Sequence, residues 1–182
     1  MKGIGLFFVF FVLFSSCNRN SLEKQLANFI GKEIFFPENL QANLKGRDTL
    51  IHLTNAPMKM VVWYDSVGCT ACRMQHIYEW GEIIHYVNDI RDVFDLVFIF
   101  SPKSSDLHNV KIDLRTSGFK YPAYIDKENL FRKKNPGIPA DERLHTFLLD
   151  ENNKVILVGS PLRNKALWEL YKEQIEAKVP SF

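Results

Sequence analysis

The strongest constraint on the fold is a pair of cysteines at the junction between an apolar segment and a segment with helical spacing. Residues 58–64 (MKMVVWY) form a short apolar run typical of a buried strand, and residues 65–68 read as a turn. Cys69 and Cys72 follow at C-x-x-C spacing, and apolar side chains recur at helical intervals over residues 70–87. A disulfide between cysteines this close closes a very small loop and stabilises a fold little, so we interpret the pair as chemical rather than structural.

The rest of the chain continues the alternation of strands and helices. Strand patterns cover residues 58–64, 96–100, 121–125, 146–149 and 155–158, with short strands or a hairpin within 34–53. Helical patterns cover residues 21–30, 70–87, 104–117, 130–134 and 165–178. This order predicts an α/β fold with a central mixed sheet flanked by helices. A C-x-x-C that opens a helix in such a pattern indicates a thioredoxin-like redox motif.

The N-terminus reads as an export signal. Lys2 precedes an apolar run over residues 4–14, which is shorter than the roughly 20 residues of a membrane-spanning helix. The Ser-Ser-Cys sequence that ends at Cys17 resembles the lipobox of bacterial lipoproteins, which implies that Cys17 is acylated. An ordinary signal peptide with a chance cysteine, or an N-terminal anchor, are the alternatives. We expect a lipid anchor on a bacterial membrane, in the cell envelope and facing the periplasm.

We expect the chain to have three parts, the first of which is removed by cleavage before Cys17. We expect a lipoprotein signal peptide over residues 1–16, a tether and helix over 17–33, and a thioredoxin-like domain over 34–182. Without residues 1–16 the chain has 22 basic and 21 acidic side chains. This balance argues against a nucleic-acid partner, which would require a basic face.

Three segments resemble the TlpA-type thiol-disulfide oxidoreductases, a branch of the thioredoxin-like superfamily. Residues 60–72 resemble the first core strand and active-site loop of that family, and residues 121–126 (YPAYID) resemble its Phe-Pro-x-x-x-Asp segment. Residues 145–159 resemble its Thr-x-Phe-Leu-Ile-Asp hairpin. Together these segments span roughly residues 57–178. The resemblance implies thiol-disulfide exchange, with protein thiols and disulfides as substrates and an unknown redox partner that recycles the site.

The chain departs from the family at several site positions. Gly68 replaces the tryptophan that usually precedes the first cysteine. The family's proline before the third-segment strand corresponds to Leu144 or His145. Trp63 occupies the position of the superfamily's buried acid, and Asp65 is the nearest carboxylate in the sequence.

The expected chemistry divides the work between the two cysteines. Cys69, ahead of a helix N-terminus, attacks the substrate as a thiolate, and Cys72 resolves the mixed disulfide. Asp65 could accept a proton from Cys72, although a turn-forming aspartate is an equally simple interpretation. His145 could face the cysteines, or it could be a surface residue at a strand edge.

Other functions remain open at this stage. Cys69, Cys72 and His76 have C-x₂-C-x₃-H spacing, which would suit zinc if a fourth ligand existed. The cysteines could also form an inert disulfide or belong to a thiol peroxidase. A non-catalytic lipoprotein that uses the fold to bind metal or protein is the third alternative. For the favoured exchange activity we expect no cofactor and no metal.

Overall fold

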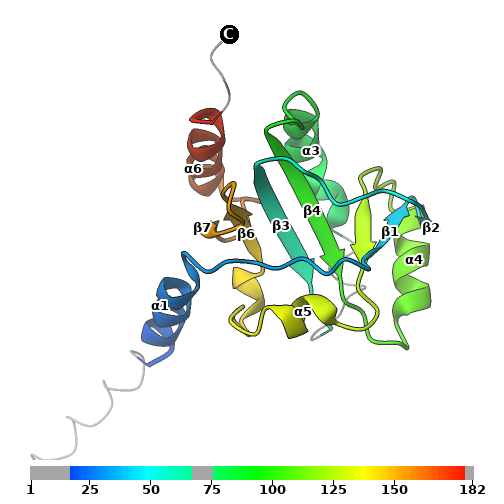
Figure 1. Ribbon diagram of the computed structural model, residues 1–182, viewed down its shortest axis with the longest axis horizontal. Coiled ribbons are helices and arrows are strands. Elements are labelled where there is room, and N and C mark those ends of the chain that lie inside the picture. The colour runs from blue at the N-terminus through cyan, green and yellow to red at the C-terminus, as the bar shows by residue number, and fades with distance from the viewer. Residues whose placement is uncertain (1–16, 67–75, 179–182) are drawn as a thin grey trace, which may run out of the picture.

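The computed structural model describes residues 17–66 and 76–178 of the 182-residue chain. Its centre is one seven-stranded sheet with the strand order β2-β1-β5-β4-β3-β6-β7 (Figure 1). The strands are β1 (Gln41–Leu44), β2 (Arg47–Asp48), β3 (Met58–Tyr64), β4 (Phe94–Phe100), β5 (Ala123–Ile125), β6 (Thr146–Leu149) and β7 (Val155–Val158). The predicted α/β architecture with a mixed central sheet is confirmed.

The middle of the sheet is parallel and its margins are antiparallel. Strands β3, β4 and β5 run in one direction, with Val61 opposite Val97 and Ile99 opposite Tyr124. Strand β6 runs antiparallel to β3 and forms a hairpin with β7, while β1 runs antiparallel to β5 and forms a hairpin with β2. The start of β6 therefore lies beside the carboxyl end of β3, which is the end that leads to the cysteines in the sequence.

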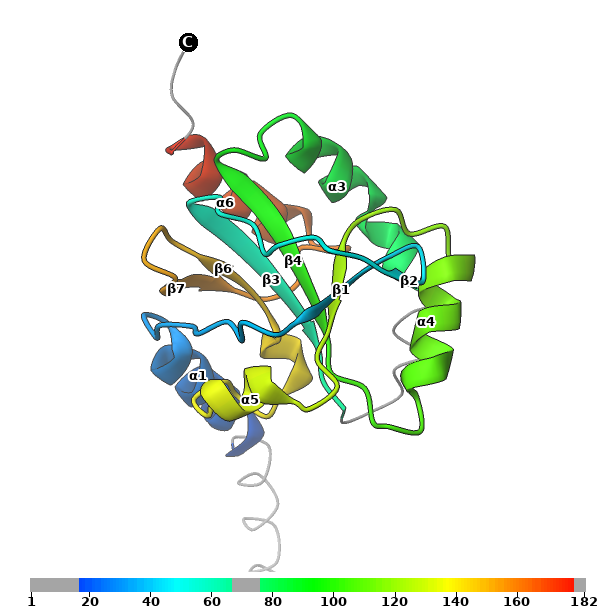
Figure 2. The ribbon, with the colours of Figure 1, turned by 45° about the vertical axis from the view of Figure 1, so that its right-hand side comes forward.

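Helices cover both faces of the sheet (Figure 2). One face packs against α3 (Gly81–Asn88), α4 (Leu107–Thr116) and α6 (Lys165–Glu176). The other packs against α1 (Cys17–Phe29) and α5 (Leu130–Lys134). Two 3₁₀ turns, η1 (Ile77–Trp80) and η2 (Glu142–Leu144), precede α3 and β6. Within the described part of the chain, no helix is both long enough and apolar enough to cross a membrane.

Because helices cover both faces of the sheet, β3 and β4 are apolar at consecutive rather than alternate positions, apart from Lys59 and Asp95 near their starts. In β3, Met60 and Val62 point into the core beneath α3, α4 and α6. Val61 and Trp63 point into the core beneath α1 and α5. Helix α1 is fastened to this second core by Phe29, whose ring meets Phe147 edge-on at 5.1 Å.

Most predicted elements are confirmed, with shifts at their ends. The strands at 146–149 and 155–158 and the helix at 130–134 have the expected bounds, and a hairpin lies within 34–53. The expected helix at 21–30 begins earlier, at Cys17. The helix expected over 70–87 is described from residue 76 onward, where a 3₁₀ turn passes into α3 at Gly81. The low helix propensity of glycine fits a change of helix type there.

Three buried tyrosines have raised pKa values in the folded protein. Burial is the main cause that raises the pKa of Tyr121, Tyr124 and Tyr171, and it raises the pKa of Tyr124 to about 12. The Tyr121 hydroxyl also donates a hydrogen bond to the buried Asp95 carboxylate, and Arg91 pairs with the same carboxylate at 3.1 Å. Because the unfolded chain ionises its tyrosines near pH 10, these groups couple stability to alkaline pH.

We expect the free energy of unfolding to fall steeply above pH 10. There the unfolded state loses the three tyrosine protons that the folded state keeps, so each tyrosine lowers stability by roughly 1.4 kcal/mol per pH unit. Urea titrations between pH 8 and pH 11.5 measure this slope. The Tyr171→Phe variant should lose about a third of it, although it also lacks the 2.8 Å hydrogen bond from Tyr171 to the Gly159 carbonyl. A slope identical in both proteins would contradict the expectation.

Candidate active site

A hollow of about 280 Å³ lies at the carboxyl end of β3. It is lined by Val62, Trp63, Tyr64, His76, Trp80, Glu142, Arg143, His145, Thr146, Ser160 and Leu162. Tyr64 is the last residue of β3 and His76 immediately precedes η1, so the hollow touches both described flanks of residues 67–75. That nine-residue segment carries Cys69 and Cys72.

The predicted site residues divide into two groups. Cys69 and Cys72 lie outside the described residues. Asp65, Leu144 and His145 are described, and all three are buried. Leu144 ends η2 and is not among the residues that line the hollow, whereas His145 is. Cys17, the predicted lipidation site, is the first residue of α1.

His145 occupies the position directly before β6 and faces the end of β3. Its carbonyl accepts a 2.9 Å hydrogen bond from the Trp63 amide, and its ring lies 4.5 Å from the Trp63 ring. Only 3% of His145 is exposed. The alternative prediction of a surface histidine at a strand edge is therefore wrong, because the ring is enclosed between β3 and the segment that precedes η2.

The His145 ring is oriented by the backbone of that preceding segment. Its Nε2 atom lies 2.9 Å from the Pro139 carbonyl oxygen, and since a carbonyl can only accept, Nε2 carries the proton. The Nδ1 atom consequently points the other way and lies 3.8 Å from Oδ2 of Asp65. A second proton on the ring would therefore sit opposite a carboxylate.

Asp65 and His145 thus form a buried acid-base pair at the edge of the hollow. Asp65 follows β3 directly and is only 8% exposed. Carboxylates are rarely this buried without a charged or hydrogen-bonding neighbour, and the imidazole becomes such a neighbour when Nδ1 is protonated as well. The structure brings together the two residues that the sequence analysis named separately as support for the cysteines.

Trp63, which the resemblance puts at the position of the superfamily's buried acid, belongs to the core beneath α1 and α5. Its indole nitrogen donates to the Ser101 hydroxyl at 3.0 Å, and that hydroxyl donates to Asp126 at 3.3 Å. Asp126 in turn accepts 2.8 Å hydrogen bonds from the amides of Leu130 and Phe131 at the start of α5. The Asp126 carboxylate therefore caps the N-terminal end of α5.

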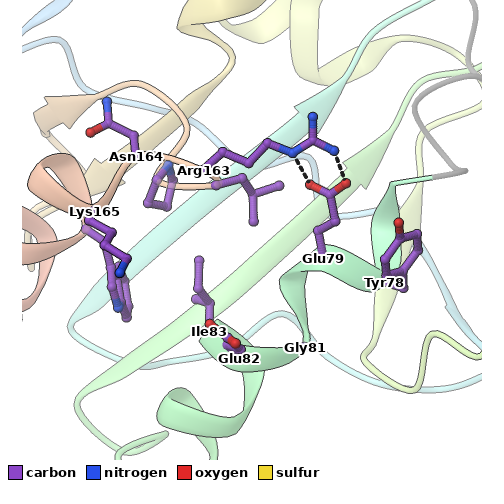
Figure 3. A pocket seen from close by; sticks show the side chains of 11 residues that line it. Tyr78, Glu79, Gly81, Glu82, Ile83, Arg163, Asn164 and Lys165 are labelled. Carbon is purple, nitrogen blue, oxygen red and sulfur yellow. Dashed lines mark hydrogen bonds and ion pairs between the residues drawn. The ribbon is translucent and has the colours of Figure 1, made fainter.

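A second hollow, of about 690 Å³, shares Leu162 with the first hollow. It is lined by residues that include Tyr78, Glu82 and Lys165 (Figure 3). Arg163 reaches across it and forms two hydrogen bonds with the Glu79 carboxylate (Figure 3). His76 Nδ1 contacts the same carboxylate at 2.8 Å. The Arg163 guanidinium is the main cause that lowers the pKa of Glu79. This network therefore links His76, which follows residues 67–75 in the sequence, to the connection between β7 and α6.

The sequence analysis identified none of these contacts. The i,i+3 spacing of His76 and Glu79 is the one signal that the sequence offers, because Arg163 is 84 residues from Glu79. The His76 side chain is exposed. Among residues 17–66 and 76–178, no three His, Cys, Asp or Glu side chains are grouped as metal ligands.

Comparison with known proteins supports the fold. No protein-family model matches the chain, and no curated protein matches its sequence. AhpC of Enterococcus faecalis is similar in structure, with 13% identity and a TM-score of 0.56 over 85% of this chain and 98% of that one.

Two further solved structures are similar. A putative thiol:disulfide interchange protein DsbE from Chlorobium tepidum has 17% identity and a TM-score of 0.54, over 83% of this chain and 98% of that one. A putative protein disulfide isomerase from Bacteroides thetaiotaomicron has 21% identity and a TM-score of 0.53, over 82% and 93%. The chain therefore has a thioredoxin-like fold.

Proposed function

We propose that this protein is a TlpA-type thiol-disulfide oxidoreductase that acts through Cys69 and Cys72. The observation that carries the proposal is the hollow at the carboxyl end of β3, which is lined on one side by Tyr64 and on the other by His76. The sequence between these two residues contains both cysteines, and the two described residues Tyr64 and His76 both line this hollow. The buried pair of Asp65 and His145 lies at the same place.

The proposed reaction passes two electrons between this site and a substrate. In the reducing direction the Cys69 thiolate attacks a substrate disulfide, which forms a mixed disulfide and releases one substrate thiolate. The Cys72 thiolate then attacks the Cys69 sulfur, which closes the Cys69–Cys72 disulfide and releases the second substrate thiolate. A separate redox partner must reduce the site again. The oxidising direction runs through the same steps in reverse.

The proposal extends to the location of the enzyme. The apolar run that ends at Cys17 supports export and lipid anchoring on a bacterial membrane. In the cell envelope, disulfides persist and protein thiols are the available substrates. Two of the similar structures carry names of the thiol-disulfide exchange class, which agrees with this reaction.

Reduction of a model protein disulfide tests the reaction. With dithiothreitol as electron source, the purified protein should accelerate reduction of insulin, and the Cys69→Ser/Cys72→Ser double variant should not. A parallel assay offers hydrogen peroxide as the electron acceptor. Peroxide consumption without insulin reduction would replace the proposal by the peroxidase alternative, and stoichiometric zinc in the purified protein would replace it by the metal-binding one.

Asp65 is expected to assist the second step of exchange by accepting the Cys72 proton. The Asp65→Asn variant should resolve mixed disulfides roughly 100-fold more slowly near pH 7, within the range for loss of a general base. Because hydroxide can then deprotonate Cys72 instead, the deficit should shrink as pH rises. Stopped-flow kinetics on a preformed mixed disulfide measures this step separately from the first attack.

Glu128→Gln is the matched control for Asp65→Asn. Glu128 is exposed and lines neither of the two hollows, so its substitution removes one negative charge away from the buried pair. This variant should keep the wild-type rate and pH profile. If Asp65→Asn behaves like Glu128→Gln, Asp65 has no part in proton transfer.

A further inference from the structure

A third hollow, of about 530 Å³, lies far from the candidate active site, between the β1–β2 turn and the connection from α4 to β5. Because β3, β4 and β5 are parallel, the segment that enters β5 lies at the opposite end of the sheet from the carboxyl end of β3. The hollow is lined by four basic residues and no acidic one: Lys45, Arg47, Arg115 and Lys120, with Leu44, Gly118 and Phe119.

These four side chains are all exposed, and none of them has an ion pair or hydrogen bond within the described part of the chain. Their neighbour Lys111 differs, because it pairs with Asp48 at 2.7 Å. Other basic side chains on the surface also pair with carboxylates, including Arg143, Arg163, Lys172 and Lys178. The chain as a whole is nearly balanced, with 23 basic and 21 acidic residues. The excess of positive charge at this hollow is therefore a local feature and not a property of the whole chain.

The backbone that carries the basic residues is held firmly. Lys45 and Gly46 have φ angles of +53° and +76°, as a two-residue hairpin turn of type I′ requires. A Cβ atom on Gly46 would lie 2.5 Å from Cβ of Arg115 and 2.6 Å from the carbonyl oxygen of Lys111. The turn thus packs directly on α4, and both ribbon views show the hairpin beside that helix (Figures 1 and 2).

The shape and chemistry of the hollow indicate the class of ligand. Its volume lies within the roughly 300–1,000 Å³ of small-molecule sites. Phe119 supplies a fixed apolar wall, since it is buried and meets Phe98 edge-on at 5.0 Å. A phosphate monoester carries about −1.5 to −2 charges at neutral pH, and its oxygens match the planar donors of arginine. Such a group would relieve the mutual repulsion of four like charges.

We propose that this hollow binds a phosphate-bearing ligand, with Arg47 and Arg115 as the main donors and Lys45 and Lys120 as flanking charges. The phosphate belongs either to a soluble ester or to a lipid headgroup. The site is independent of the redox function, because it shares no lining residue with the hollow at β3.

Calorimetric titration of the full chain with two probes tests the proposal. Inorganic pyrophosphate represents soluble phosphates, and dihexanoyl phosphatidic acid, a phosphate monoester, represents headgroups when used below its micelle concentration. We expect saturable binding of at least one probe, weakened at least tenfold in the Arg47→Gln/Arg115→Gln variant. The Lys133→Gln/Lys134→Gln variant loses the same charge from exposed positions on α5 and should bind like wild type.

The results distinguish the two sources of the phosphate from each other, and both from failure of the proposal. Tighter binding of pyrophosphate assigns the site to soluble phosphates, and tighter binding of the lipid assigns it to headgroups. Absence of binding by both probes, or equal affinity in wild type and the arginine variant, overturns the proposal. Unfolding midpoints of the variants, which should match wild type, show that a loss of affinity is not a loss of fold.

Discussion

Substitution of Cys69 by serine is expected to reduce thiol-disulfide exchange to the uncatalysed rate. The hydroxyl of serine is not ionised at neutral pH and cannot attack a disulfide, whereas a cysteine at a helix N-terminus has a pKa between roughly 3.5 and 7.5. The Cys69→Ser variant should retain one thiol in the pair, Cys72, which reacts slowly with alkylating reagents. Insulin reduction and alkylation rates measure the two effects.

The Cys72→Ser variant provides the complementary result. It should keep the first attack and lose resolution, so covalent mixed disulfides with substrates should accumulate and identify those substrates. Alkylation of this variant across pH should give an apparent pKa for Cys69 well below the ordinary value of about 8.5. If Cys69 titrates as an ordinary thiol and Cys72 reacts faster, the two roles are reversed. If neither substitution changes exchange, the redox function is wrong.

Substitution of Cys17 by serine is expected to abolish lipid anchoring. The variant has no thiol to acylate, so it should either leave the membrane fraction or persist as an unprocessed precursor that is larger by residues 1–16. Membrane fractionation, with mass spectrometry of the N-terminal peptide, measures both outcomes. Cys72→Ser is the matched control, since it removes a cysteine without touching the signal and should fractionate like wild type. Identical fractionation and migration of the Cys17→Ser variant would contradict the lipoprotein assignment.

Local sequence signals sufficed for much of the fold. The β6–β7 hairpin was predictable because two short apolar strands flank a polar turn, in which Asp150 accepts hydrogen bonds from the amides of Asn152 and Lys154. Helix α1 ends at Phe29, one residue before the expected end, and Gly31 just beyond it has the positive φ of +79° that glycine readily adopts. Such features depend on neighbours within a few residues.

The site depended on contacts that no local pattern encodes. The environment of His145 follows from the Pro139 carbonyl, which belongs to the connection between α5 and η2, where the sequence has no helical or strand periodicity. Similarly, the basic hollow forms only because Gly46 lets the β1–β2 turn approach α4, about 65 residues further along the chain. The resemblance to the TlpA-type family pointed to Asp65 and His145 individually, and only the tertiary arrangement of β3 and β6 brings them together.

Redox titration of the cysteine pair tests the central claim most directly. The purified protein is equilibrated in thiol-disulfide buffers of graded potential, alkylated, and analysed by mass spectrometry for the labels on Cys69 and Cys72. The account predicts that both thiols are labelled or protected together in a reversible two-electron transition. In that transition, a tenfold change in the ratio of dithiol to disulfide spans about 30 mV. A midpoint near −270 mV would indicate a reductant and one near −120 mV an oxidant. Labelling of the two cysteines that is independent of potential, or that changes at only one of them, would contradict the assignment of this protein as a thiol-disulfide oxidoreductase.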